Sequence, residues 1–295
     1  MSIDLFINQL FSGLVRSALF FLVTSGLTLL FGVVGVLNMS HFSLYMVASY
    51  ITWTFSKILL GYNFSYIIAL AMAAVCMCTF AWLIERLFFR YLYNRLMPEQ
   101  LLITFSIIYI IDDLSKVLWG ATPLYIAKPD FLTKAINIGT ISFPLAGIFV
   151  LVLGIVTGLG TWFLLARTRL GRILRAAYSH KEMISCLGIP IKKIYLAMFI
   201  FSVLLVSIAG SAWPLVGMVD LGQGHAILIE CFCVMVIGGM GSFVGTAVAS
   251  LLVGLTYSFG ILVVPKMATL LIFCLAGVIL IFRPWGLMGT VGRMH

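Results

Sequence analysis

Apolar runs of about twenty residues recur along the whole chain, for example at 10–31, 64–88, 143–166 and 194–213. A helix needs about twenty apolar residues to cross the hydrocarbon core of a bilayer, and an open sheet cannot cross it because its edges leave backbone groups unpaired. Only 9% of the 295 residues are charged, too few to cover a soluble globule. We therefore predict an all-α, polytopic integral membrane protein with about 8–10 transmembrane or re-entrant helices.

Two irregular stretches, at 32–41 and 217–225, interrupt this pattern with glycines and polar residues. Each is either part of a whole crossing or a re-entrant element, and hydropathy does not distinguish the two. Val34-Gly35 followed by Asn38 and Val216-Gly217 followed by Asp220 have equal spacing, which an inverted repeat or chance would explain. The connections are short, so the chain is expected to form a single domain over residues 1–295.

The basic residues are concentrated in three clusters, which hold 12 of the 18 lysines and arginines. Such an excess beside spans marks the cytoplasmic side of a membrane protein. Because these residues flank spans, we predict no nucleic-acid binding. The clusters are Arg86, Arg90 and Arg95; Arg167, Arg169, Arg172, Arg175, Lys181, Lys192 and Lys193; and Arg283 and Arg293.

The first apolar run is too long for a signal-peptide core and has no basic leader, so we interpret it as a retained span. Four of the six cysteines lie in apolar helix as two Cys-x-Cys pairs. On a helix the two thiols of such a pair point about 200° apart, which suits neither a metal nor a disulfide framework.

Ionisable residues inside spans are costly and invite a functional hypothesis. Asp112 and Asp113 fall near the outer end of the run 101–119. Lys116 follows Asp112 by four residues, so the two are placed to neutralise each other on one helix face, and we favour this structural interpretation. Arg16 lies near a predicted helix start, where its side chain is expected to reach the headgroups.

Glu230 has no basic neighbour in the sequence, and an interfacial and a pathway-facing position are equally open for it. An unwound segment around His41 would expose hydrogen-bonding groups to a polar solute, although a buried structural histidine fits equally well. Glycines in the third interruption, at 238–242, serve either close helix contact or a broken helix. The candidate pathway residues are Asn38, Ser40, His41, Glu230, Gly238, Gly239 and Gly241.

A basic, water-soluble segment at 168–193 separates two long apolar runs. Ser179 and Glu182 have the spacing of a capping box, in which each side chain satisfies a free backbone N–H at a helix start. Gly188 and Pro190 favour an end to that helix about two turns later. A helix this short is marginal in water, so we expect a partner to hold it; an ordinary cytoplasmic loop is the alternative. Its apolar stripe would consist of Met183, Ile184 and Leu187.

This segment resembles the cytoplasmic loop by which bacterial ABC-importer permeases dock on an ATPase. The resemblance rests on Thr168-Arg169-Leu170-Gly171-Arg172, on Arg175-Ala176, and on Glu182 and Gly188. Met183 and Ile184 replace the two alanines of the family's Glu-Ala-Ala-x-x-x-Gly signature. The resemblance assigns ATPase coupling to Gly171, Arg172, Arg175, Ser179, Glu182, Met183, Ile184, Leu187 and Gly188.

Further blocks, in the family's order, are similar to branched-chain amino-acid importer permeases, specifically the H-type subunit. They are residues 26–38 with His41, Glu85-Arg86-Leu87 with Arg90, residues 238–242, and Arg283-Pro284 with Gly286-Leu287. The chain departs from the family after Asn38, where Ser40, His41, Phe42 and Ser43 stand in place of a small residue and a Gly-Glu pair around the histidine. The solute is therefore open among amino acids, amides, urea and aromatic acids.

The resemblance implies a non-enzymatic permease subunit, with a coupling loop at about 167–193, in a multi-pass ABC importer of the bacterial inner membrane. The expected cargo is a small polar solute, branched-chain or other amino acids foremost. No Gly-x-x-x-x-Gly-Lys-Ser/Thr motif occurs, so we expect this chain to bind no cofactor and its partner subunits to use ATP. The implied partners are two ABC ATPase subunits, a second homologous permease of M-type or a second copy, a periplasmic substrate-binding protein and the lipid membrane.

Two other classes compete with this interpretation. An autonomous secondary transporter or channel for a small polar solute would need ion-coupling groups inside the membrane, for which Asp112, Asp113, Glu230 and the histidines are the candidates. An integral-membrane enzyme would need a nucleophile, a metal cluster or paired acids, and the sequence has no convincing set.

Overall fold

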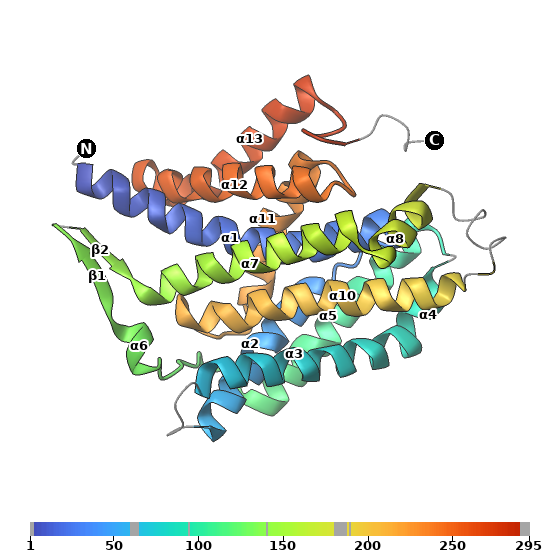
Figure 1. Ribbon diagram of the computed structural model, residues 1–295, viewed down its shortest axis with the longest axis horizontal. Helices are drawn as coiled ribbons and strands as arrows, with labels where there is room; N and C mark the ends of the chain where they lie inside the picture. Colours follow the sequence, from blue (N-terminus) through green and yellow to red (C-terminus); the bar gives the residue numbers. More distant parts are fainter. Residues whose placement is uncertain are drawn as a thin grey trace.

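The computed structural model describes residues 3–59, 65–93, 95–139, 141–179, 188 and 190–289. Nine helices of fifteen residues or more make up most of this part of the chain (Figure 1). They are α1 (Ile3–Val34), α2 (His41–Ile58), α3 (Ser65–Ile84), α5 (Met97–Trp119), α7 (Leu145–Arg167), α10 (Ile191–Ala212), α11 (Gln223–Gly238), α12 (Phe243–Val263) and α13 (Ala268–Phe282).

Shorter elements connect these helices. A π-helical turn η1 (Glu85–Phe89) joins α3 to α4 (Arg90–Leu92), and α8 (Arg169–Ser179) follows α7. The segment expected to lie outside the membrane contains α6 (Asp130–Thr133) and an antiparallel hairpin of β1 (Ala135–Ile138) and β2 (Ile141–Pro144). The 3₁₀ turns η2 (Trp213–Leu215) and η3 (Pro265–Met267) complete the described elements.

Six helical segments are long and apolar enough to cross a membrane, namely Ile3–Val34, Ser65–Leu92, Leu145–Arg167, Ile191–Leu215, Phe243–Val263 and Pro265–Phe282. With α2, α5 and α11 they confirm the predicted polytopic helical architecture. The small hairpin was not predicted, because its strands are only four residues long and gave no clear alternation.

Helix α1 is the centre of the bundle and packs against α7, α10, α11 and α12. Its side chains Leu22, Val23 and Leu27 are completely buried. A helix that is apolar on all sides is stable only when it is enclosed in this way or by lipid. By contrast, α7 and α13 turn most of their apolar side chains outward, including Phe163 and Val278, as helices that face lipid do.

Both predicted irregular stretches interrupt the helical bundle. After α1, Gly35 takes a φ of 78°, a left-handed conformation that favours glycine, and α2 begins three residues after Asn38. Helix α11 likewise begins three residues after Asp220, and in both cases the backbone N–H of the first helical residue bonds to the carbonyl of Asn38 or Asp220. The matched glycines differ, because Gly217 is not among the glycines with a positive φ, so the inverted repeat stays a hypothesis.

The third predicted interruption separates α11 from α12. Gly239 and Gly241 have φ values of 95° and 92°, and the Ser242 side chain caps α12 by accepting a hydrogen bond from the Gly245 N–H. The chain after α13 packs on this break, where the N–H groups of Leu287 and Met288 bond to the carbonyls of Ile237 and Gly238. A Cβ on Gly239 would lie 2.5 Å from the Gly289 nitrogen, so no larger residue fits there.

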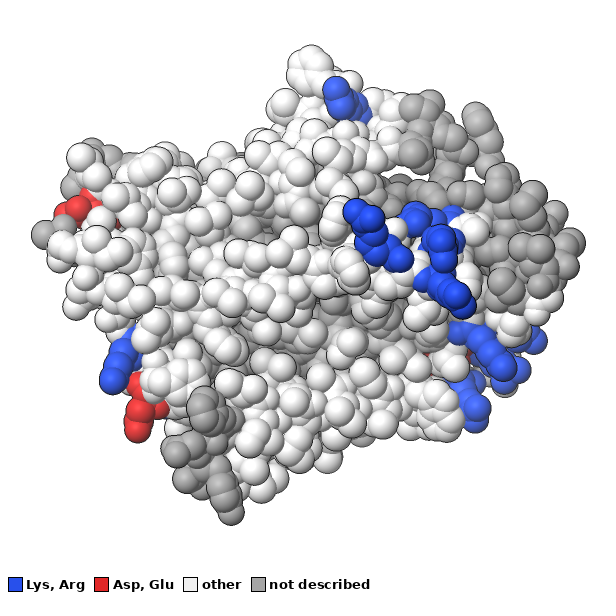
Figure 2. All heavy atoms as spheres, in the orientation of Figure 1, with Lys and Arg blue, Asp and Glu red and all other residues white. Residues whose placement is uncertain are grey.

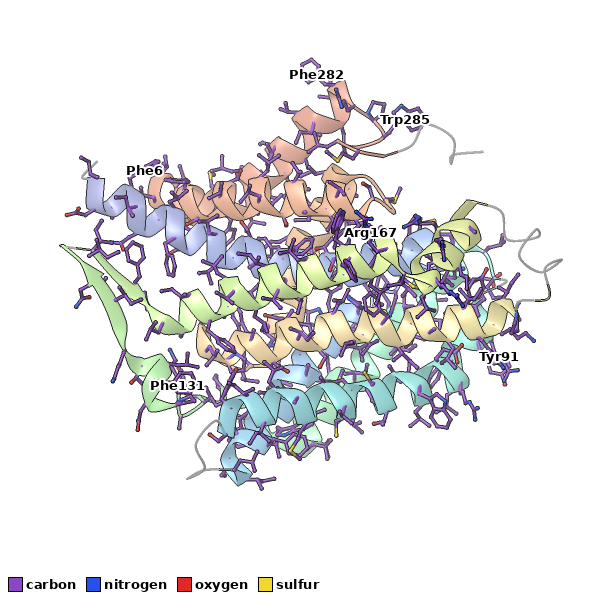
Figure 3. All side chains as sticks on the ribbon, in the orientation of Figure 1. Phe6, Tyr91, Phe131, Arg167, Phe282 and Trp285 are labelled. Atoms are coloured by element: carbon purple, nitrogen blue, oxygen red, sulfur yellow. The ribbon has the colours of Figure 1, made fainter. Side chains whose placement is uncertain are left out.

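The described residues of the first two basic clusters gather toward one end of the molecule, although they are far apart in sequence. They lie where α3, α4, α7 and α8 end and where α10 begins (Figures 1 and 2). Figure 3 places Tyr91 and Arg167 at this end and Phe6 and Phe131 at the other, beside the β-hairpin. We call it the basic end; the positive-inside rule makes it cytoplasmic. Arg283 of the third cluster follows α13, and Figure 3 shows the neighbouring Phe282 at the top of the view, near the middle of its long axis.

Candidate translocation site and coupling surface

Polar side chains form a buried connection between α2, α10 and α11. The Ser49 hydroxyl donates to the Gly210 carbonyl at 2.6 Å and accepts a hydrogen bond from Gln223 Nε2 at 2.6 Å. Thr52 donates to the Ser211 hydroxyl at 2.8 Å. Helices α2 and α10 can approach this closely because residue 210 is glycine: a Cβ there would lie 2.3 Å from the Tyr45 carbonyl oxygen.

The segment from Asn38 to His41 is fully buried. The Ser40 hydroxyl donates to Asn38 Oδ1 at 2.6 Å, and His41 Nε2 donates to the Val23 carbonyl of α1 at 3.1 Å. Asn38 Nδ2 and His41 Nδ1 have no hydrogen-bond partner among the described residues. Buried polar atoms are normally paired, so these two nitrogens are exceptions among the buried polar groups of the bundle.

Asp112 joins the beginnings of α2 and α11. Its carboxylate accepts a hydrogen bond from Ser43 at 2.9 Å and lies 2.7 Å from His225 Nε2. The predicted pairing of Asp112 with Lys116 was therefore wrong, because tertiary partners from two other helices occupy the carboxylate. Asp113 lies on the outer face of α5 and is exposed.

Arg16 and Glu230 form an ion pair inside the bundle. Arg16 Nη2 lies 3.8 Å from Glu230 Oε2, and the Glu230 side chain is 6% exposed. The guanidinium also stacks over the Tyr257 ring at 3.7 Å. The expected position of Arg16 near a helix start was wrong: α1 begins at Ile3, so Arg16 lies about 20 Å along the helix axis, with its side chain 32% exposed.

Arg16 lines two cavities, and Glu230 lines the smaller of them. The smaller has a volume of about 120 Å³ and lies between α1, α2 and α11, with Arg16, Tyr45 and Glu230 in its wall. The larger, of about 490 Å³, shares Arg16 and Trp213 with the smaller and extends along the first half of α1 to Lys128 and the strand β2. It therefore extends toward the end of the molecule opposite the basic end.

At the basic end, α8 folds back against α7. Thr168 caps α8 by accepting a hydrogen bond from the Gly171 N–H at 3.1 Å. A Cβ on Gly171 would lie 2.2 Å from the Leu165 carbonyl oxygen, so glycine permits the close contact between the two helices. Arg172 and Arg175 are exposed, and Arg175, one helical turn after Gly171, donates to the Leu165 carbonyl of α7.

Helix α8 was not predicted as a helix, and its last residue is Ser179. Glu182, Met183, Ile184 and Leu187 lie outside the described residues, so the capping box and its apolar stripe stay predictions. Gly188 has a φ of 73° and open space around its Cα, as a helix-ending glycine requires.

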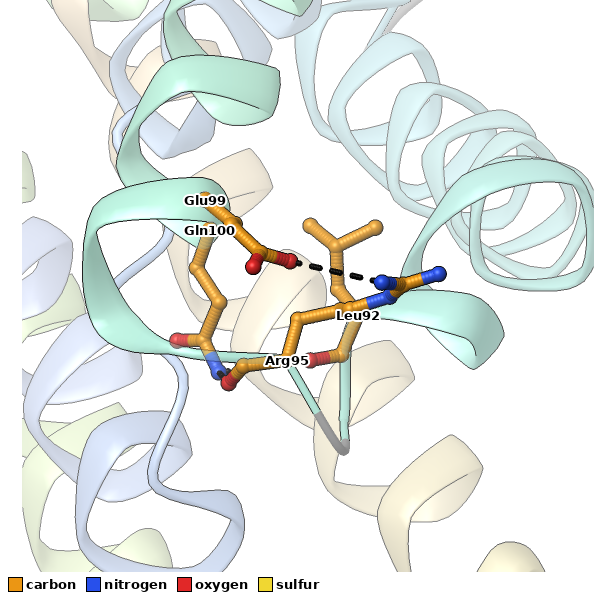
Figure 4. A network of polar contacts seen from close by, with 4 residues as sticks. All are labelled: Leu92, Arg95, Glu99 and Gln100. Carbon is orange, nitrogen blue, oxygen red and sulfur yellow. Dashed lines mark hydrogen bonds and ion pairs between the residues drawn. The ribbon is translucent and has the colours of Figure 1, made fainter.

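A second polar network closes the turn between α4 and α5 beside α8. Gln100 Nε2 donates to the carbonyls of Leu92 and Arg95 at 3.2 and 3.0 Å, and Arg95 pairs with Glu99 at 3.6 Å (Figure 4). The Tyr93 hydroxyl donates to Glu85 Oε1 at 2.8 Å. Burial and the Glu85 carboxylate raise the pKa of Tyr93 well above its usual range, so Tyr93 keeps its proton and this bond.

The described residues contain no group of three or more His, Cys, Asp or Glu side chains that is placed to hold a metal ion. The family described as "Branched-chain amino acid transport system / permease component" matches residues 9–283. The chain belongs to this family. It is a permease subunit of an ABC importer, it spans the bacterial inner membrane several times, and it is not an enzyme.

Curated relatives of this permease match it over nearly their whole length. It is 28% identical to the high-affinity branched-chain amino acid transport system permease protein BraD of Pseudomonas aeruginosa, over 96% of each chain. It is 23% identical to LivH of Escherichia coli K12, again over 96% of each chain. A solved structure, PsaBC from Streptococcus pneumoniae in complex with Fab, shares 14% identity over 92% of this chain and 89% of that chain, with a TM-score of 0.45.

The permease works with ATPase and substrate-binding partners in a membrane. Among the predicted pathway residues, the structure brings Asn38, Ser40 and His41 together, while the glycines at 238–241 lie at the break that packs on the C-terminal segment. Glu230 lies at the small cavity. The sequence analysis did not identify Tyr45 and Gln223 as residues of this cavity. The signal in the sequence that pointed to the cavity was the presence of opposite charges, Arg16 and Glu230, within two apolar runs.

Proposed function

We propose that this permease imports a branched-chain or other amino acid across the inner membrane. The observation that carries the proposal is the Arg16–Glu230 ion pair in the wall of a small cavity inside the bundle, with Arg16 also lining a larger cavity. Charged groups at such depth are costly and are kept where a polar substrate passes. The printed names of BraD and LivH, which refer to branched-chain amino acid transport, support the same substrate class.

The remaining partners of the importer complete a pore and supply energy. A second homologous permease of M-type forms the other half of the pore, and two ABC ATPase subunits dock at the basic end. The ATPases use ATP, while this chain binds no cofactor. A periplasmic binding protein delivers the amino acid at the opposite end, where the larger cavity extends to Lys128.

Energy enters through the segment at about 167–193. Closure of the two ATPase subunits on ATP moves Gly171, Arg172, Arg175, Ser179, Glu182, Met183, Ile184, Leu187 and Gly188 as one coupling surface. Because α8 packs closely on α7, displacement of this surface is transmitted into the spans. The bundle then alternates between outward and inward access, as a two-state element biased by the ATPases.

The pathway for the solute includes Asn38, Ser40, His41, Glu230 and the break at Gly238, Gly239 and Gly241. The unpaired nitrogens of Asn38 and His41 support the first part of this assignment. Irregular backbone at membrane depth is tolerated where it borders a cavity or is buried in protein.

Uptake of labelled leucine into proteoliposomes tests the proposed function. The vesicles contain this permease and its partner permease, with or without the ATPases, and the binding protein is added outside. We expect uptake only with the ATPases, ATP and the binding protein together. ATP-independent uptake would favour an autonomous transporter or channel, and absence of amino-acid uptake by the full complex would contradict the substrate class.

A further inference from the structure

The small cavity beside Glu230 is chemically unlike the rest of the bundle interior. Its volume of about 120 Å³ is well above the roughly 10–15 Å³ that a single water needs. Arg16, Asp220 and Glu230 supply charged groups to its wall, and Tyr45 and Gln223 supply neutral polar ones. The cavity is therefore large enough for a small solute, and its wall carries both positively and negatively charged groups that can bind one.

The ion pair in the cavity is loose. Arg16 Nη2 and Glu230 Oε2 are 3.8 Å apart, whereas a charge-assisted hydrogen bond is about 2.7–2.9 Å long. Stacking on Tyr257 holds the plane of the guanidinium but uses none of its N–H donors. Both charges thus keep hydrogen-bonding capacity that their own pairing does not use.

Three polar atoms around the cavity are buried and unpaired among the described residues. Arg16 Nε is a donor, Gln223 Oε1 is an acceptor, and the Tyr45 hydroxyl is both. Tyr45 and Gln223 are only 1% and 5% exposed. Buried groups without partners are costly, so a donor and acceptor set of this kind indicates a missing ligand that brings both acceptors and donors.

We propose that this cavity binds a zwitterionic amino acid, with the α-carboxylate at Arg16 and Tyr45 and the α-ammonium at Glu230 and Gln223. The inference rests on the proposed function and assigns the binding residues within it. The carboxylate accepts from Arg16 and Tyr45, while the ammonium donates to Glu230 and Gln223. Leu19, Phe20 and Ile227 form the apolar part of the wall, which suits an aliphatic side chain.

The larger cavity shares part of its wall with this site, at Arg16, Leu19 and Trp213, and extends to Asn8 and Lys128. These residues lie toward the end opposite the basic end, where the binding protein is proposed to deliver its cargo. The guanidinium thus lies where an arriving carboxylate first meets the small cavity.

Ligand-observed NMR on the full importer complex in nanodiscs, without ATP or binding protein, tests the site directly. The probes are leucine, 4-methylpentanoate, which lacks the ammonium, and leucinamide, which lacks the carboxylate. In the wild-type complex, 4-methylpentanoate and leucinamide are each expected to bind at least about tenfold more weakly than leucine, because each probe lacks one charged hydrogen-bonding group. Equal binding of all three probes would overturn the proposal.

Two isosteric or near-isosteric variants locate each contact. In Glu230→Gln, 4-methylpentanoate should bind less than about threefold more weakly than leucine, because the charged partner of the ammonium is gone. In Arg16→Gln, leucinamide should likewise bind less than about threefold more weakly than leucine, because the charged partner of the carboxylate is gone. Asp113→Asn and Lys116→Gln, both exposed on α5, are matched controls and should keep the wild-type discrimination. Wild-type discrimination in Glu230→Gln or Arg16→Gln would show that the ion pair is only structural.

A single change leaves one buried charge unpaired and can impair assembly. The double variant Arg16→Gln/Glu230→Gln removes both charges together and should assemble, as checked by size-exclusion chromatography, yet lose preference for the zwitterion. Retained preference would overturn the site. If the wild-type complex transports leucine but does not bind it in this assay, the site alone is wrong; if it neither transports nor binds leucine, the proposed substrate class fails as well.

Discussion

At the scale of single residues, the ion pair Arg16–Glu230 shows what the sequence can and cannot reveal. Glu230 was recognisable as a charge in an apolar run, but its partner lies on α1, far away in sequence. Arg16 was misplaced because α1 begins seven residues before the apolar run does, which moves Arg16 from a helix start to its interior. Partner choice for buried charges is a tertiary property that local spacing does not encode.

Replacement of Asn38 by Ala or of His41 by Ala should reduce amino-acid uptake while the complex still assembles. Each side chain has one unpaired nitrogen and one satisfied hydrogen bond at a buried position, so its loss removes both a polar group of the proposed pathway and one local contact, which a bundle of packed spans tolerates. The measurement is initial uptake rate at equal amounts of assembled complex. Ser106→Ala on the exposed face of α5 serves as the control. Normal uptake by both variants would mean that this segment is only structural.

At the scale of elements, most of the long helices were predictable because six helical segments are apolar runs of membrane-spanning length. Their bounds were less predictable, since α1 begins seven residues before its apolar run. Helix α8 was not predictable in this way, because it is short and basic and has no long apolar run of its own. Its close packing on α7 at Gly171 and the burial of Leu174 stabilise it instead. The breaks at Gly35 and Gly239 were predicted from glycine, since a positive φ favours it.

Gly171→Ala should uncouple ATP hydrolysis from transport. The added Cβ would lie 2.2 Å from the Leu165 carbonyl oxygen, so α8 must move away from α7, at a cost of about 1–3 kcal/mol. We expect normal insertion and a several-fold loss of binding-protein-stimulated ATPase activity. Gly160→Ala on α7, where a Cβ meets nothing within 4 Å, is the matched control and should behave as the wild type. Equal activity of the two variants would show that the α7–α8 contact does not transmit motion.

At the scale of the whole molecule, the structure gathers the described residues of two separate basic clusters, those at 86–95 and 167–193, toward one end, which the distribution of charge along the sequence predicted as the cytoplasmic side. Orientation can be tested by single cysteines in a background without the six native ones. Cysteines at Arg90 and Ser179 should react with an impermeant thiol reagent only from the cytoplasm, and one at Lys134 only from the periplasm. Periplasmic labelling at Arg90 or Ser179 in intact cells would reverse the assigned topology.

The central claim is that separate ATPases drive this permease through the segment at about 167–193. Glu182→Ala tests it most directly, because loss of a helix cap costs about 0.5–2 kcal/mol, too little to unfold a bundle of packed spans. The measurement is ATP hydrolysis by the reconstituted complex with and without loaded binding protein. We predict that the variant complex assembles in normal amounts but that its hydrolysis no longer responds to the binding protein and its uptake collapses. Wild-type stimulation and uptake in Glu182→Ala would contradict the account.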